Sequence, residues 1–304
     1  MLIDAVERYI ALHRAMGRLF HNDTYLLRLF ARHATQRGDQ VVRSGTTLEW
    51  AAQARRSAGA RRQRLLAVRR FARRVRAEDP RHEIPPVDAF GPAPPRRTPY
   101  IFAADAIRSL LDATAALGPP GSLRPKTYAT LLGLLVCTGL RISEAIALQT
   151  QDITDAGLVI RLSKFRKSRL VPLHDTTRRA LQEYLAARQA YAGEDTALFL
   201  SEGCTRLRYS TVNAVFLLLI RAIGIHPGPG NPGPRIHDMR HTFAVRSLEQ
   251  CTGDRQAVAR HMLALSTYLG HALLANTYWY LQATPRLLAD IAAQTESQAM
   301  GGTP

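Results

Sequence analysis

The chain has 304 residues, and 46% of them are hydrophobic, which allows two domains with buried cores and argues against a disordered protein. The 41 Lys and Arg residues outnumber the 24 Asp and Glu residues and give a net charge of +17, so we expect a polyanionic partner, with nucleic acid ahead of an anionic membrane surface. Separated cysteines without a CxxC pair, no signal-like start and no bilayer-length apolar run favour a cytoplasmic protein with reduced thiols.

The first 80 residues show apolar positions at helical spacing in four successive segments, so we predict an N-terminal helical domain over residues 1–80. The fourth segment is expected to bury one apolar stripe. That stripe consists of Leu65, Val68, Ala72 and Val75.

Ten arginines and no acid lie between residues 55 and 76. Such a face could simply be solvated. Without acids it repels itself, however, which favours a surface that follows DNA phosphates. The arginines expected to bind phosphate are Arg62, Arg69, Arg73 and Arg76.

Residues 81–100 are predicted to be a linker, because seven prolines lie between Asp79 and Tyr100. Proline at this density resists both helix and strand and keeps the chain extended. A second domain is therefore expected over residues 101–304.

The second domain is predicted to be mainly helical with one small sheet, which makes the whole chain mainly α with a small β-sheet (α+β). Alternating residues at 158–162 and 169–173, joined by a basic turn, predict a hairpin with cations at its tip. A Gly/Pro-rich stretch before His237 predicts a loop. Helical spacing is found at residues 103–117, 125–140, 176–191, 211–225 and 240–250, and a short helix opens after Arg141.

Six side chains of this domain are suited to handling a phosphodiester. A histidine and an arginine in "IHDMRH" lie three residues apart, so one helical turn places both on one face. Each candidate is a weak signal alone, but their order along the chain rarely arises by chance. The six are Arg141, Lys164, His237, Arg240, His271 and Tyr280.

The segments that carry these residues, "TGLRISEAIAL", "KFRKSRLVPL", "HDMRHTFA" and "YLGHALLANTYWY", resemble the tyrosine recombinases, also called the phage integrase family. The resemblance covers roughly residues 101–290, nearly all of the second domain. It implies a SAM-like core-binding domain followed by the recombinase catalytic domain. It also implies an enzyme that cuts and rejoins DNA through a covalent 3′-phosphotyrosyl bond, with no metal or cofactor.

The residue types fit that chemistry. Arg141 and Arg240 are expected to neutralise the charge that develops on the non-bridging phosphate oxygens. His237 and His271 would add hydrogen bonds, with His237 the proton acceptor. The resemblance gives the hairpin lysine, Lys164, the role of protonating the departing 5′ oxygen.

Three further residues near these candidates have expected roles. Glu144 matches the family's acid one turn after the first arginine and is expected to orient the site. Arg166 and Lys167 compete with Lys164 for the acid role and are otherwise expected to bind DNA; the spacing back from "RLVPL" favours Lys164.

Two tyrosines compete for the role of nucleophile. In the family the nucleophile lies nine residues after the Gly-His histidine, and counting from His271 gives Tyr280. Residues two positions apart on a helix are rotated by roughly 200° about its axis. Tyr278 therefore cannot face the same site as Tyr280 and is expected to pack with Trp279.

Other functions remain open at this stage. The histidines of "HDMRH" have zinc-binding spacing, but Asp238 stands where a zincin needs Glu, and no third ligand follows. A non-catalytic DNA-binding regulator on the same fold would not need every catalytic position to be filled. A type IB topoisomerase shares the chemistry, although the short chain and compact first domain look more like a recombinase.

The resemblance also predicts an assembly. Recombinases of this kind act as homo-tetramers on paired sites of double-stranded DNA, in some cases with other recombinase subunits, and the biological task could be integration, resolution or transposition of a mobile element. The C-terminal stretch carries Leu287, Leu288 and Ile291 on one helical face. It could dock on a neighbouring subunit or fold back on its own domain.

Overall fold

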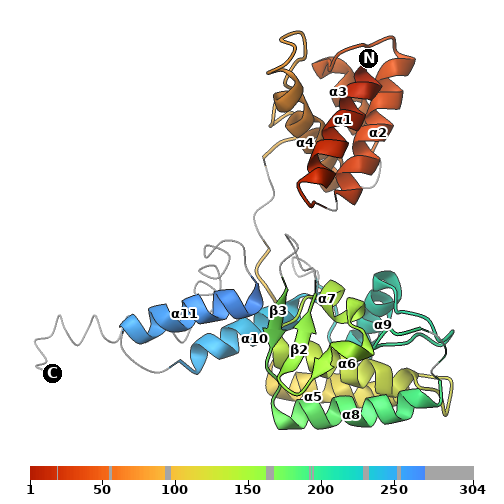
Figure 1. Ribbon diagram of the computed structural model, residues 1–304, viewed down its shortest axis with the longest axis vertical. Coiled ribbons are helices and arrows are strands. Elements are labelled where there is room, and N and C mark those ends of the chain that lie inside the picture. The colour runs from red at the N-terminus through yellow and green to blue at the C-terminus, as the bar shows by residue number, and fades with distance from the viewer. Residues whose placement is uncertain are drawn as a thin grey trace, which may run out of the picture. The chain divides into compact units, whose positions relative to one another are not determined.

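The computed structural model describes residues 1–18, 20–54, 57–92, 97–161, 168–191, 193, 195–228, 233–251 and 255–270. The chain divides into two compact units, Met1–Arg96 and Arg97–Pro304, and each is described by itself (Figure 1). The described residues are mainly helical with one small sheet, so the predicted fold class is confirmed. None of the helices formed by these residues is long and apolar enough to cross a membrane.

The N-terminal unit is a helical bundle. The stripe predicted on the fourth helix is confirmed, since Leu65, Val68, Ala72 and Val75 are all buried. They pack into one core with Phe30 and the apolar faces of the other helices, and each large buried side chain contributes about 1.5–3 kcal/mol to stability. The helices are α1 (Leu2–Ala15), α2 (His21–Gln36), α3 (Ser44–Ala52) and α4 (Ala58–Val75).

The start of the proline-rich stretch contacts this bundle. His82 is buried, and its Nδ1 accepts a hydrogen bond from the backbone N–H of Val42 (3.0 Å). The carboxylate of Glu83 accepts from the N–H of Ser44 (2.7 Å), the first residue of α3, where helix N–H groups lack partners within the helix. The compact N-terminal unit therefore extends beyond residue 80.

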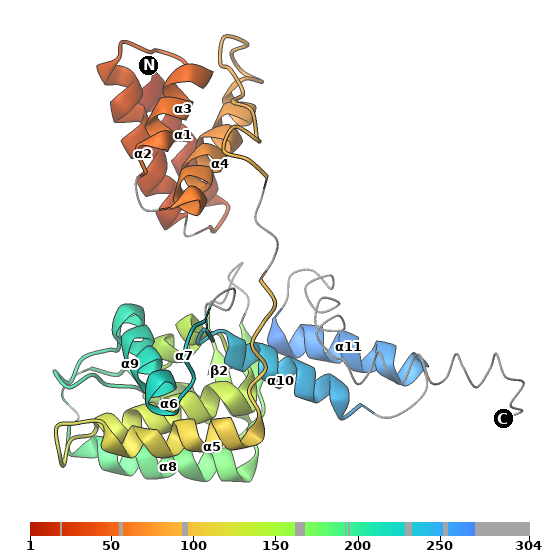
Figure 2. The same cartoon turned by 180° about the vertical axis from the view of Figure 1, so that it is seen from behind.

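The second unit is built around α6. Helices α5, α8 and α10 pack against it, as both views show (Figures 1 and 2). Leu131 and Leu132, in the middle of α6, are completely buried. The helices are α5 (Ala104–Asp112), α6 (Arg124–Thr138), α7 (Ile142–Ala147), α8 (Asp175–Gln189), α9 (Tyr209–Ala222), α10 (Asp238–Glu249) and α11 (Arg255–Leu269), with the 3-10 turns η1 (Ala113–Ala116) and η2 (Thr150–Asp152).

The sheet of this unit is antiparallel, in the order β1-β2-β3, with Leu158 opposite Val171 and Ile160 opposite Arg169. The predicted hairpin is confirmed in its two strands, which are shorter than expected. Its basic turn, residues 162–167, lies outside the described residues. The strands are β1 (Ile153–Thr154), β2 (Gly157–Ile160) and β3 (Arg169–Val171).

Strand β1 and helix α11 are among the elements that were not predicted from the sequence. Strand β1 has only two residues, which is too short to show an alternating pattern. Helix α11 could have been found, because Val258, Met262, Leu265 and Leu269 follow helical spacing. These residues pack with α10, and the two helices lie side by side in both views (Figures 1 and 2).

Candidate active site

A sharp turn between α6 and α7 presents Arg141. Gly139 follows the last residue of α6 with φ of +61°, in the left-handed region that glycine adopts without strain. A Cβ at Gly139 would lie 2.5 Å from Cδ1 of Phe243 in α10, so the packing of α10 at this turn also requires glycine. Arg141 is then the N-cap of α7.

Glu144 fixes Arg141 in place. Its carboxylate accepts from the backbone N–H of Arg141 (3.0 Å) and from Nη1 of the same residue (2.8 Å). It also accepts two bonds from Arg169, Nη1 to Oε1 (3.0 Å) and Nη2 to Oε2 (2.8 Å). Four donors therefore surround two carboxylate oxygens, which is the full accepting capacity of a glutamate.

Glu144 is kept ionised by these contacts. Burial alone would raise the pKa of its carboxyl group. The hydrogen bonds from Arg169 and from the Arg141 backbone, together with the charges of both arginines, outweigh burial and lower the pKa to about 2. The expected role of Glu144 in orienting Arg141 is consistent with this geometry.

Arg240 approaches the same turn from α10. Its Nη1 donates to the carbonyl of Gly139 (2.6 Å) and its Nη2 to the carbonyl of Leu269 (2.7 Å). The residue is 2% exposed. Arg240 therefore joins the α6–α7 turn to the end of α11.

The last turn of α11 is held by three arginines. Consecutive carbonyl groups of Tyr268, Leu269 and Gly270 accept from Arg169 Nε (2.9 Å), Arg240 Nη2 (2.7 Å) and Arg141 Nη2 (3.0 Å), respectively. Carbonyl groups at a helix C-terminus have no partners within the helix and carry partial negative charge, so guanidinium groups suit them. Both predicted catalytic arginines thus converge directly before position 271.

His237 stands at the N-cap of α10, and its ring is 4.8 Å from that of His241. The residue is exposed to solvent. Partial desolvation by the surrounding protein atoms lowers the pKa of His237 to about 4, and the positive charges of Arg240 and Arg141 act in the same direction. The ring is therefore neutral at pH 7.

The loop before His237 is anchored at its end by Asp238. This carboxylate is fully buried and accepts from the backbone N–H of Arg235 (2.7 Å) and from its Nη2 (2.9 Å). The described residues contain no group of three His, Cys, Asp or Glu side chains that could hold a metal ion, so the zinc alternative lacks a third ligand among them.

Five of the predicted site residues lie outside the described residues, as do the competing tyrosine at 278 and the C-terminal stretch with Leu287, Leu288 and Ile291. The predicted residues concerned are Lys164, Arg166, Lys167, His271 and Tyr280.

The structure changes the interpretation of the α4 arginines. Three of the four expected phosphate-binding residues donate to backbone carbonyls of the segment that follows: Arg62 to Gly91 (3.0 Å), Arg69 to Pro85, and Arg76 to His82 (3.4 Å). These arginines are seven residues apart, so they share one face of α4. They hold residues 82–91 along the helix.

The fourth, Arg73, is exposed. Its neighbours on α4 also find acids that are absent from the basic run itself: Arg70 pairs with Asp23 (2.8 Å) and Arg74 with Glu78 (3.1 Å). The face is therefore less purely cationic than the sequence suggested. The tertiary fold supplies partners from α2 and from beyond α4.

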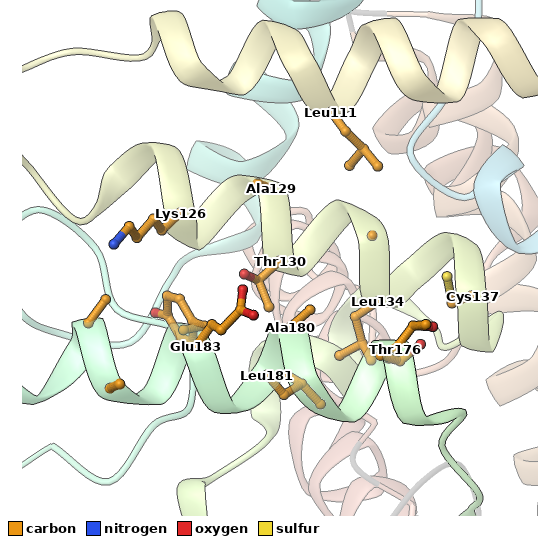
Figure 3. A pocket seen from close by; sticks show the side chains of 15 residues that line it. Leu111, Lys126, Ala129, Thr130, Leu134, Cys137, Thr176, Ala180, Leu181 and Glu183 are labelled. Carbon is orange, nitrogen blue, oxygen red and sulfur yellow. The ribbon is translucent and has the colours of Figure 1, made fainter.

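An open groove lies elsewhere in this unit. It runs between α6 and α8, with an apolar floor that includes Leu134 and Leu181 and with Lys126 and Glu183 toward one end (Figure 3). The predicted catalytic residues that the structure describes, Arg141, His237 and Arg240, do not line this groove. In the described part of the chain, the candidate site is marked by its charged side chains.

Arg169 is the residue of this cluster that sequence reasoning missed. The segment "RLVPL" that begins with it predicts a strand and the position of Lys164, but no role for Arg169 itself. Its contacts are with Glu144 and Tyr268, which are distant in sequence, so spacing alone gave no sign of them.

Comparison with known proteins identifies the chain. Residues 101–286 match the phage integrase family. The chain is 37% identical over 303 residues to protein y4rB of Sinorhizobium fredii, whose name places it provisionally among integrases and recombinases, and the match covers 96% of each chain. It is 30% identical over 320 aligned residues to the tyrosine recombinase XerC of Chromohalobacter salexigens, covering 99% of this chain and 98% of that one.

A solved structure shows the same fold. The XerH site-specific recombinase bound to a palindromic difH substrate gives a TM-score of 0.64 at 17% identity, covering 90% of this chain and 78% of that chain. The family match, the full-length relatives and the shared fold agree. The chain belongs to the phage integrase family of tyrosine recombinases.

Proposed function

We propose that this recombinase breaks and rejoins DNA through Tyr280. The Tyr280 hydroxyl attacks a phosphodiester, the phosphorus–O5′ bond breaks, and the 3′ end becomes a phosphotyrosyl ester while the 5′ end leaves as a hydroxyl. The ester keeps the energy of the broken linkage. A 5′ hydroxyl from another strand can therefore reverse the step and rejoin the DNA without ATP.

The observation that carries this proposal is the convergence of Arg141 and Arg240 on adjacent carbonyls at the end of α11. His271 directly follows Gly270 in the sequence, and Tyr280 follows nine residues later. We propose that a phosphate bound by the two arginines is presented to these two residues.

The two arginines would share the phosphate charge. The side chain of Arg141 is 23% exposed, and its side-chain contacts with described residues use two of its five N–H donors, which leaves donors that could meet phosphate oxygens. Fixed donors of this kind stabilise the charge that builds up on the non-bridging oxygens in the transition state. Arg240 is buried and already held in position, so little reorganisation would be needed.

Proton transfers complete the step. His237 is neutral at pH 7, so a ring nitrogen can accept the proton of the Tyr280 hydroxyl. An approaching phosphate would raise the pKa of His237 and make it a better acceptor. Lys164, or Arg166 or Lys167 in its place, would donate a proton to the departing O5′ oxygen.

The net charge of +17 supports binding to double-stranded DNA. We further propose a homo-tetramer on two paired sites, because exchange between two duplexes breaks four strands and each subunit supplies one tyrosine. Other recombinase subunits could replace some copies. The proposed compartment is the cytoplasm, and the C-terminal stretch from residue 285 is proposed to dock on a neighbouring subunit.

A suicide substrate tests the chemistry. Nicked duplexes that carry the DNA flanking the gene, mixed with a random-sequence library, lose a short strand on cleavage and trap the phosphotyrosyl adduct. Denaturing electrophoresis should show the adduct with the wild type and with Tyr278→Phe, but not with Tyr280→Phe. Sequencing the trapped DNA would then identify the site.

The opposite results are informative. An adduct that forms with Tyr280→Phe but not with Tyr278→Phe would identify Tyr278 as the nucleophile. DNA binding without any adduct would indicate a regulator. Relaxation of plasmids that lack paired sites would indicate topoisomerase activity.

A further inference from the structure

Arg169 links three parts of the candidate site that are far apart in sequence. It lies at the start of β3, opposite Ile160 in β2, and follows the basic turn at residues 162–167 by two positions in the sequence. Its guanidinium reaches Glu144 in α7 with two hydrogen bonds and Tyr268 at the end of α11 with a third. Its side chain is only 13% exposed, so water competes little for these bonds.

We propose that Arg169 is a positioning residue for cleavage: it fixes Arg141 through Glu144 and fixes the segment before His271 through the end of α11. The inference rests on the proposed function, since Arg141 and His271 are the groups it would position. Among the described residues Arg169 bonds to Glu144 and Tyr268 and not to Arg141, and it is not proposed to touch DNA.

The geometry requires an arginine. Two parallel bonds to a carboxylate use both Nη atoms, while Nε points along the side of the guanidinium toward a third acceptor. A lysine has one nitrogen and cannot span Glu144 and the Tyr268 carbonyl in this way. The distances of 3.0, 2.8 and 2.9 Å show that the guanidinium makes all three bonds together.

Gly270 is shaped for the same contact. A Cβ at Gly270 would lie 3.1 Å from Nη1 and 3.3 Å from Cζ of Arg169, and the residue has φ of +65°. Gly270 therefore has two roles: it lets the backbone turn after α11, and it leaves room for the guanidinium of Arg169 beside it. Arg169 and Gly270 form one contact surface.

The closing experiment compares Arg169→Gln and Arg169→Lys with a matched control, Arg178→Gln. Arg178 also donates to two backbone carbonyls, those of Thr154 (2.9 Å) and Asp155 (2.8 Å), but contacts neither Glu144 nor α11. Single-turnover cleavage of a trapped suicide substrate at saturating DNA gives the rate, and a titration gives the DNA affinity. Both Arg169 variants should cleave about 10²-fold more slowly, the cost of misplacing catalytic groups by about 1 Å, with DNA affinity changed less than about threefold.

A pH series separates positioning from a general loss of packing. Without Arg169 the Glu144 carboxyl loses its strongest donor and protonates more readily. The rate of Arg169→Gln relative to wild type should therefore fall further as the pH drops from about 8 toward about 5. A packing defect alone would lower the rate by one factor at every pH, and that result would overturn the proposal.

A measurement without DNA keeps the test independent of the proposed chemistry. Amide hydrogen exchange in residues 262–270 should accelerate in Arg169→Gln and stay unchanged in Arg178→Gln, with α9 as the internal reference. Wild-type-like cleavage by both Arg169 variants, or unchanged exchange, would refute the positioning role while leaving the reaction intact. No adduct with wild type under any condition would instead refute the proposed function, and exchange would still decide whether Arg169 holds the end of α11.

Discussion

Arg141 and Arg240 donate hydrogen bonds to neighbouring carbonyl groups, Arg141 to Gly270 (3.0 Å) and Arg240 to Leu269 (2.7 Å). One arginine begins α7 and the other lies in the first turn of α10. Their meeting point is the C-terminal turn of α11, which leads into the segment with His271 and Tyr280. The two guanidinium groups at the end of this helix therefore supply positive charge that could neutralise a bound phosphodiester.

Arg240→Lys should reduce cleavage strongly. A lysine cannot donate to the carbonyls of Gly139 and Leu269 together, and one buried acceptor would lose its partner. We expect single-turnover cleavage at saturating DNA to fall about 10²–10³-fold and the free energy of unfolding to fall by about 1–3 kcal/mol. Arg246→Lys, on the same helix with a single bond to the Phe102 carbonyl (2.9 Å), is the control. Equal effects of the two substitutions would contradict a special role for Arg240.

Gly139→Ala should destabilise the catalytic unit. The residue has φ of +61°, and an added Cβ would lie 2.5 Å from Phe243 Cδ1 and 3.0 Å from Leu269 Cδ2. Left-handed strain and overpacking together should lower the free energy of unfolding by about 2–4 kcal/mol, measured by urea denaturation. Gly133→Ala, inside α6 and with open space at its Cβ, should be neutral or stabilising by up to about 1 kcal/mol. Similar losses at both positions would show that the turn is not tightly packed.

Glu144→Gln should reveal a pH-dependent contribution to stability. The pKa of Glu144 is lowered from 4.5 to about 2, so the folded state binds a proton less readily than the unfolded state. This stabilisation is fully present above pH 4.5 and is lost as the pH falls toward 2, with a size of about 3 kcal/mol. Urea unfolding of wild type and variant at several pH values should give a difference that is constant near neutrality and shrinks in acid. A difference that does not vary with pH would mean that Glu144 gains nothing from its arginine partners.

Arg73→Gln and Arg69→Gln should act on different properties. Arg73 is exposed, so its loss should weaken DNA binding of every sequence and reduce the slope of log affinity against log salt by about 0.9. Arg69 donates to the Pro85 carbonyl, so its loss should lower the free energy of unfolding by about 1 kcal/mol and leave the salt slope nearly unchanged. Fluorescence anisotropy at several salt concentrations and urea unfolding measure the two effects. If Arg69→Gln changes the salt slope as much as Arg73→Gln does, residues 82–91 do not shield it from DNA.

Local patterns in the amino-acid sequence predict the fold class, the buried stripe of α4, the family and the order of the chemical groups. Each of these depends on short-range patterns: helical periodicity within a segment, the glycine before a turn, or the spacing of a histidine and an arginine in one helical turn. Because such patterns are local, they can be read without knowing what packs against them.

The pairing of charged side chains with their partners depends on the tertiary structure. The arginines of α4 find carbonyls in residues 82–91 and an acid in α2, Glu144 takes Arg169 as its second partner, and three guanidinium groups share the last turn of α11. These partners are distant in sequence and are brought together by the burial of apolar faces, which specifies no particular charge pair. A hydrogen bond between residues that are distant in the chain leaves no periodic pattern in a single sequence. The contacts of Arg169 with Glu144 and Tyr268 are therefore seen only in the folded chain.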